Sequence, residues 1–261
     1  MKHYSFKEIL GSYTSTKKKR SSYWARCFSR PLSFPVTYVL INLGLSANAV
    51  SIMSMFEAII ACVLIMCGGT LMYWGVGLFV FWHVLDCVDG NIARVKKQSS
   101  YAGAFLDAAS GYIAPAFVFL AVGTAAYHTT QYNNADYIFI ILGGVSSASD
   151  VLARMIYQRY LVTEFRVGLV GKDGDIDQVR SSGLAHIADL IMKNMSYSCL
   201  YMPLLILASI FSKFDALTAL YFVYTIGILF ATFIMFIKKA FTLDARIAEA
   251  GLTKDSEVIE F

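Results

Sequence analysis

Asp86-Cys-Val-Asp89-Gly90-Asn-Ile-Ala93-Arg94, followed by Gly103-Ala-Phe-Leu-Asp107, is the stretch that decides the fold expected for this chain. It lies within one of the most apolar parts of the sequence, between the runs 71–85 and 112–126. Charged groups inside such a segment are costly in lipid unless they face one another, water or a metal ion. The stretch therefore predicts a functional site within a membrane.

The spacing of the carboxylates predicts one shared site on two antiparallel helices. Asp86 and Asp89 are three residues apart, so they lie on one face of a helix. At ~1.5 Å rise per residue they lie roughly 16 Å and 12 Å from the exit of that helix near Lys96, and Asp107 lies roughly 10 Å inside on the returning helix. Because carboxylates at similar depth repel one another, we expect a cation among them. Oxygen ligands favour Mg²⁺ or Mn²⁺, and Mg²⁺ usually binds phosphate oxygens as well.

This pattern resembles the signature of the CDP-alcohol phosphotransferases, Asp-x-x-Asp-Gly-x-x-Ala-Arg-x8-Gly-x3-Asp-x3-Asp. The matching residues, with all spacings kept, are Asp86, Asp89, Gly90, Ala93, Arg94, Gly103 and Asp107. The resemblance implies a homodimer of six-span protomers. It also implies that an acceptor hydroxyl attacks a CDP-alcohol, that a phospho-alcohol group is transferred and that CMP is released. Such a reaction would serve the synthesis of phospholipids or of lipid-linked glycans.

The resemblance also implies roles for individual residues. Asp86, Asp89 and Asp107 would hold Mg²⁺ or Mn²⁺, and Asp107 would also take part in catalysis. The expected contacts to the CDP-alcohol are Asn48, Ser51, Asp86, Gly90, Ala93, Arg94, Ser100 and Gly103. The alternative role for Asn48 is that of a helix cap, which Ser46 could also fill.

One position departs from the family pattern. The fourth aspartate of the signature would stand four residues after Asp107, where this chain has Gly111. The resemblance implies that this fourth aspartate is a metal ligand and the general base for the attacking hydroxyl. Three alternatives follow. The acceptor needs no protein base, Asp150 or Glu57 supplies the missing carboxylate, or the chain binds a CDP-alcohol or a partner without turnover.

Two charged residues of a later apolar segment are further candidate catalytic residues. Asp150 and Arg154 are four residues apart, so they could pair on one helix face. The structural interpretation is that the two residues form an internal salt bridge. The functional alternative is that Arg154 binds a substrate phosphate through its bidentate fork, while Asp150 takes part in catalysis.

The composition predicts an all-α membrane protein. Hydrophobic residues make up 57% of the 261 positions and charged residues only 15%, which excludes an ordinary water-soluble domain. We expect a basic cytoplasmic arm over 1–46 that includes an N-terminal interfacial amphipathic helix over 31–46, a six-helix transmembrane domain over 47–241 and a cytoplasmic tail over 242–261. The expected spans are 47–68, 71–97, 100–127, 135–160, 183–211 and 215–241.

The distribution of positive charge predicts the orientation. The loops expected outside carry one of the 22 Lys and Arg residues, Lys213. This asymmetry favours both termini and the carboxylate site in the cytoplasm. The compact chain suggests the inner membrane of a prokaryote. The basic run 17–20 favours anionic lipid rather than a nucleic-acid partner.

A function of another class is a small membrane transporter, because charges within a membrane also mark ion pathways. No inverted repeat or pair of broken helices favours that alternative.

Overall fold

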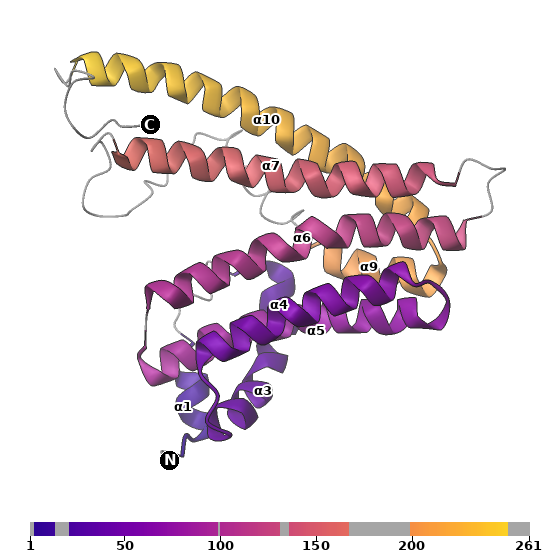
Figure 1. The fold of residues 1–261 in the computed structure, drawn as a ribbon. Coiled ribbons are helices and arrows are strands. Elements are labelled where there is room, and N and C mark those ends of the chain that lie inside the picture. Colours follow the sequence, from indigo (N-terminus) through magenta and orange to yellow (C-terminus); the bar gives the residue numbers. More distant parts are fainter. Residues whose placement is uncertain (1–2, 14–20, 99, 131–135, 167–198, 250–261) are drawn as a thin grey trace.

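The computed structural model describes residues 3–13, 21–98, 100–130, 136–166 and 199–249, and the regular structure within these ranges is helical throughout. Five of the helices are long and apolar enough to cross a membrane, and they run lengthwise through the molecule (Figure 1). They are α4 (Ala47–Met66), α5 (Gly69–Lys96), α6 (Tyr101–Thr129), α7 (Ile138–Arg166) and α10 (Phe214–Glu249).

The predicted all-helical membrane fold is confirmed. The first four expected spans correspond to α4, α5, α6 and α7, and α10 continues past the expected end of the last span at 241. The expected span over 183–211 lies mostly outside the described residues. Its described part is α9 (Tyr201–Phe211), a short apolar helix. The count of six spans therefore stays a prediction.

The segment before α4 contains helices that the sequence analysis did not predict. Helix α1 (Phe6–Gly11) begins at a capping box, in which Ser5 and Glu8 bond each other's backbone N–H groups. A π-helical turn, η1 (Ala25–Ser29), leads directly into α3 (Arg30–Asn42). Helix α3 corresponds to the expected interfacial helix over 31–46, but it runs through Pro35 and ends at Asn42.

Helix α3 buries a polar stripe and exposes an apolar one. Arg30, Ser33 and Thr37 are buried against the rest of the fold, whereas Leu32 and Val39 are about half exposed. A water-soluble helix would have the opposite arrangement. An outward apolar stripe suits a helix that lies against lipid, and the inward polar stripe is available to build a site.

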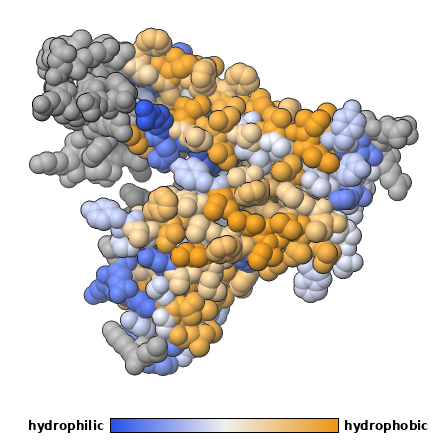
Figure 2. Space-filling view, in the orientation of Figure 1, coloured by the Kyte–Doolittle hydropathy of each residue, from blue (hydrophilic) through white to orange (hydrophobic). Residues whose placement is uncertain are grey.

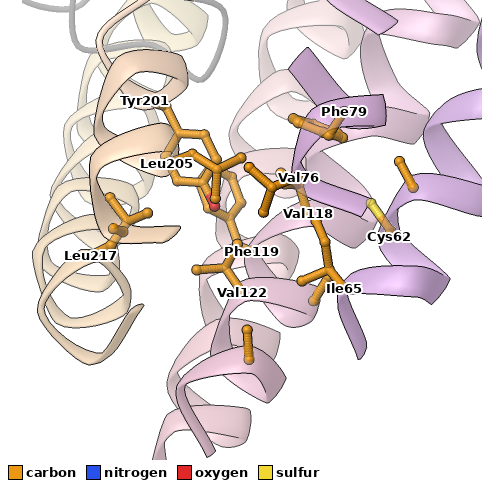
Figure 3. Close-up of a cluster of buried hydrophobic side chains, with 14 of the residues drawn as sticks. Cys62, Ile65, Val76, Phe79, Val118, Phe119, Val122, Tyr201, Leu205 and Leu217 are labelled. Atoms are coloured by element: carbon orange, nitrogen blue, oxygen red, sulfur yellow. The ribbon is translucent and has the colours of Figure 1, made fainter. Parts of the chain in front are cut away.

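The main core lies where α4, α5, α6, α9 and α10 meet. Figure 3 shows its central side chains, among them Ile65, Phe79, Phe119, Tyr201 and Leu217. The face of the molecule shown in Figure 2 is hydrophobic over the middle of the helices and more hydrophilic toward their ends. This banding is what a protein that spans a bilayer presents.

Helices α6 and α7 approach each other closely at two glycines. A Cβ atom on Gly123 would overlap the backbone carbonyl of Phe139, and one on Gly143 would overlap that of Phe119. Small residues of this kind allow membrane helices to pack backbone against backbone. The contact joins α7 and its partner α10 to the remainder of the bundle.

Three helix ends meet at one end of the bundle, beside α1 and α3 (Figure 1). Helix α4 begins there with Ser46 as its cap, whose Oγ accepts the N–H of Ala49 at 3.2 Å. Helix α5 ends there at Lys97, which adopts the left-handed conformation. Helix α6 begins with Ser100, whose Oγ accepts the N–H of Gly103 at 3.0 Å. These ends bring the sequence motif to one place.

Candidate active site

A cavity of about 710 Å³ lies at this end of the bundle, between α3, α4, α5 and α6. Its volume is in the range of small-molecule binding sites. Every residue that the motif predicts for metal or CDP-alcohol binding lines it: Asn48, Ser51, Asp86, Asp89, Gly90, Ala93, Arg94, Ser100, Gly103 and Asp107. The structure therefore brings together residues that are up to 59 positions apart in the sequence (Asn48 and Asp107).

The three carboxylates differ in exposure. Asp89 is buried, Asp86 is half-buried and Asp107 is exposed. One oxygen of Asp89 accepts the hydroxyl of Ser51 at 2.6 Å, and the other accepts the backbone N–H of Gly90. Both bonds favour the ionised carboxylate and hold it in one orientation. Ser51 therefore holds Asp89 in place, and the contact of Ser51 to the nucleotide stays a prediction.

The carboxylates could hold a divalent cation only together with oxygen ligands from a substrate. Asp89 and Asp107 are close enough for their charges to interact unfavourably. In the described part of the chain, no three acidic, imidazole or thiol groups lie close enough to enclose an ion by themselves. Mg²⁺ in phosphoryl-transfer sites is commonly held by one or two carboxylates together with substrate phosphates. Carboxylate oxygens that leave some coordination positions of the cation open for substrate phosphate would allow Mg²⁺ to bind in this way.

Two glycines keep space within the cavity. A Cβ atom on Gly90 would lie 3.2 Å from Nη1 of Arg94, so the glycine allows this guanidinium to fold back along α5. A Cβ atom on Gly103 would lie 3.1 Å from both Oδ1 of Asn48 and Oγ of Ser100. A side chain at either position would therefore intrude on polar groups that line the site.

Positive charge lines another part of the cavity. Arg94 donates from Nη2 to Oδ1 of the buried Asn91 at 2.6 Å, and its Nε is buried with no hydrogen-bond partner among the described residues. Arg30, from α3, and Lys97 also line the cavity. The sequence analysis missed Arg30 and Asn91. Asn91 occupies an unspecified position of the motif, and Arg30 is one of several basic residues in the N-terminal segment, so neither carried a distinct signal.

The candidates for the missing carboxylate lie elsewhere. Asp150 and Arg154 form an ion pair on α7, with Nε of Arg154 2.6 Å from Oδ2 of Asp150. Neither is among the residues that line the cavity, and neither is Glu57 or Gly111. Both oxygens of Glu57 are buried with no hydrogen-bond partner in the described ranges. The catalytic assignment of Asp150 and Arg154 stays a prediction, and their mutual pairing fits the alternative of an internal salt bridge.

An all-helical membrane fold with an acidic and basic cavity defines a membrane enzyme or binding protein for a charged ligand. The sequence model of the CDP-alcohol phosphatidyltransferase family matches residues 45–243, well over half of the chain. The chain belongs to this family, which confirms the resemblance seen in the motif. Its class is that of phosphotransferases that use a CDP-alcohol in lipid synthesis. No curated protein matches the chain.

Proposed function

We propose that this chain transfers a phospho-alcohol group from a CDP-alcohol to the hydroxyl of an acceptor, in the synthesis of a phospholipid or a lipid-linked glycan. The observation that carries the proposal is the single cavity in which α4, α5 and α6 gather the motif residues. Family membership supplies the reaction class. The cavity combines carboxylates suited to a metal ion with guanidinium groups suited to phosphate.

The proposed reaction is a phosphoryl transfer that balances without a further reactant. The acceptor oxygen bonds to the phosphorus that carries the alcohol. The bond from that phosphorus to the bridging oxygen of the diphosphate breaks, and CMP leaves with the bridging oxygen. The hydroxyl proton must pass to a base. The products are CMP and a phosphodiester.

The carboxylates of α5 and α6 would hold the divalent cation. Asp86 and Asp89 contribute from α5, and Asp107 contributes from α6. A bound Mg²⁺ or Mn²⁺ would neutralise the phosphate oxygens and stabilise the leaving group. The hydroxyl of Ser51 orients Asp89 and favours its ionised form, and Arg94, which lines the cavity, would bind phosphate.

Asp107 is the group that we assign to accept the proton. It lines the cavity and is the most exposed of the three aspartates, so it can pass a proton to water. This role accounts for a site with glycine at position 111. Asp150 and Glu57 remain alternatives, and either would have to act from outside the lining of the cavity.

We infer that the cavity faces the cytoplasm of a prokaryotic inner membrane, in a homodimer whose protomers each carry a site. The positive charge of the inner loops supports the orientation. Labelling of introduced cysteines in intact cells tests it. In a chain whose five native cysteines are replaced by serine, reagents that do not cross the membrane should label Lys213→Cys and should leave Lys97→Cys unlabelled until the cells are opened.

The experiment that tests the function is a CMP-release assay on the full chain in lipid nanodiscs. It uses Mg²⁺, a panel of CDP-alcohols and a panel of acceptors. Asp86→Asn should abolish CMP release, because it removes a cavity carboxylate. Asp215→Asn is the matched control, since Asp215 lies in the first turn of α10 and is not among the residues that line the cavity. Equal activity of wild type and Asp86→Asn would contradict the proposal.

Binding of a CDP-alcohol without turnover is the second candidate, and Gly111 is the observation that favours it. The assay separates the two functions if CDP binding is measured on the same preparation. Binding without CMP release from any donor would support the second candidate. Restoration of CMP release by Gly111→Asp would then identify the missing carboxylate as its cause.

A further inference from the structure

Arg30 is a buried cation that the family motif does not include. It is 8% exposed and lines the cavity from α3, which lies before the family match begins at residue 45. Its Nε donates to Oγ of Ser21 at 3.0 Å, and its guanidinium lies 4.9 Å from the centre of the Tyr13 ring. Its Nη1 is buried and has no hydrogen-bond partner among the described residues.

Arg30 and Arg94 form a pair of like charges. Both line the cavity, and they are close enough for their charges to interact unfavourably. Neither forms an ion pair with an acidic residue in the described part of the chain. Asp89 compensates part of the charge of Arg94, but each guanidinium keeps a buried N–H group without a hydrogen-bond partner among the described residues, and such a pair favours a further anion. Phosphate has the charge and the geometry that such groups recognise.

The polar stripe of α3 supports this pair. The amide nitrogen of Asn91 donates to Oγ of Ser33 at 2.9 Å and to Oγ1 of Thr37 at 3.1 Å. Its oxygen accepts Nη2 of Arg94 at 2.6 Å. Asn91, Ser33 and Thr37 are fully buried, so this chain of bonds is held away from water. Helix α3 therefore supplies Arg30 directly and orients Arg94 through Asn91.

We propose that Arg30 and Arg94 together bind a phosphate group of a substrate, which makes α3 part of the binding site. This proposal rests on the function proposed above. The phosphate has two possible sources: the diphosphate of the CDP-alcohol, or a phosphate on the acceptor. The carboxylates line the same cavity, so an anion held by the arginines could also bind a cation held by the carboxylates.

Calorimetry on the full chain in nanodiscs with Mg²⁺ tests the proposal. One arm compares the binding of CDP with that of cytidine. The other arm titrates inorganic phosphate into protein that is saturated with CDP. Arg30→Gln should weaken one of these phosphate-dependent interactions by about 10- to 100-fold and leave cytidine binding within about twofold. A loss in the CDP arm assigns the donor diphosphate, and a loss in the phosphate arm alone assigns the acceptor.

Two further variants keep the test decisive. Arg26→Gln removes the same charge one turn earlier, at a residue that does not line the cavity, and should bind as wild type does. Arg30→Lys keeps a charge without the planar fork, so it should recover part of the affinity and covers the case in which Arg30→Gln fails to fold. Folding is checked by elution volume and thermal melting.

The outcomes separate this proposal from the function on which it rests. If folded Arg30→Gln and Arg30→Lys bind CDP and phosphate as wild type does, Arg30 is a structural residue and the proposal is overturned. If wild type binds no CDP, the proposed function fails. In that case, titration of inorganic phosphate into protein without CDP decides the role of Arg30. Phosphate binding by wild type that is lost in both variants supports an anion site. Phosphate binding that is absent from wild type, or unchanged in the variants, overturns the proposal.

Discussion

Replacement of Ser51 by alanine removes a hydrogen bond to one of the carboxylates that line the cavity. The hydroxyl of Ser51 lies 2.6 Å from Oδ2 of Asp89, and both residues are nearly inaccessible, at 3% and 4% exposure. Water is therefore poorly placed to replace the lost donor. A hydrogen bond to a charged group contributes about 1.5–3 kcal/mol, which corresponds to a fall of about 10- to 150-fold in kcat/KM.

The assay for this prediction is CMP release as a function of Mg²⁺ concentration. The Ser51→Ala variant should need more Mg²⁺ for half-maximal activity, because Asp89 loses a bond that stabilises its ionised form and its orientation. Ser51→Thr keeps a hydroxyl at the same position and should retain most of the activity.

Ser54→Ala is the control for Ser51→Ala. Ser54 is also buried on α4, but it donates to the carbonyl oxygen of Ser51 and contacts the hydroxyl of Ser110 at 3.4 Å, away from the aspartates. It should change kcat/KM by less than about threefold. If Ser51→Ala is as active as Ser54→Ala at every Mg²⁺ concentration, the reasoning that links Ser51 to metal binding is wrong.

Three further predictions concern the nucleotide, the helix packing and the metal ion. Gly103→Val should weaken CDP binding by at least about tenfold in calorimetry, because its side chain would crowd Oδ1 of Asn48 within the cavity; unchanged affinity would place the nucleotide elsewhere. Gly123→Ala should destabilise the fold by about 1–3 kcal/mol in thermal melting, because it separates α6 from α7. Gly77→Ala, where no atom lies within 4 Å of the added Cβ, should be neutral or slightly stabilising, and equal melting of the two variants would refute the packing argument. Chelation by EDTA should abolish CDP binding and added Mg²⁺ should restore it, whereas EDTA-resistant binding would exclude a metal-held nucleotide.

The sequence predicted the long helices well because a membrane leaves few alternatives. Apolar runs of about 20 residues have to satisfy their backbone groups as helices. The ends of α4, α5 and α6 were close to expectation because Ser46, Lys97 and Ser100 are local signals for a helix start or stop. Helix α1 was missed because its capping box begins a short helix in a polar segment, and only packing on α3 and α5 explains its presence.

The candidate site was predictable where a motif encodes it and not where packing alone creates it. Spacing indicated that Asp86, Asp89 and Asp107 would meet, and all three line one cavity. No spacing rule indicated that Arg30 would line the same cavity, because the contact between α3 and α5 is set by side chains distant in sequence. The same holds for the bond between Asn91 and Ser33, which joins residues 58 positions apart.

The most direct test of the central claim is calorimetry of CDP binding to the purified chain, with and without Mg²⁺, repeated for Asp86→Asn. The account predicts binding by wild type that requires Mg²⁺ and that is lost in Asp86→Asn. The variant should keep the elution volume and melting temperature of wild type, since Asp86 is half-buried at the cavity rather than in the core. No binding by wild type at any Mg²⁺ or Mn²⁺ concentration, or equal binding by the two proteins, would contradict it.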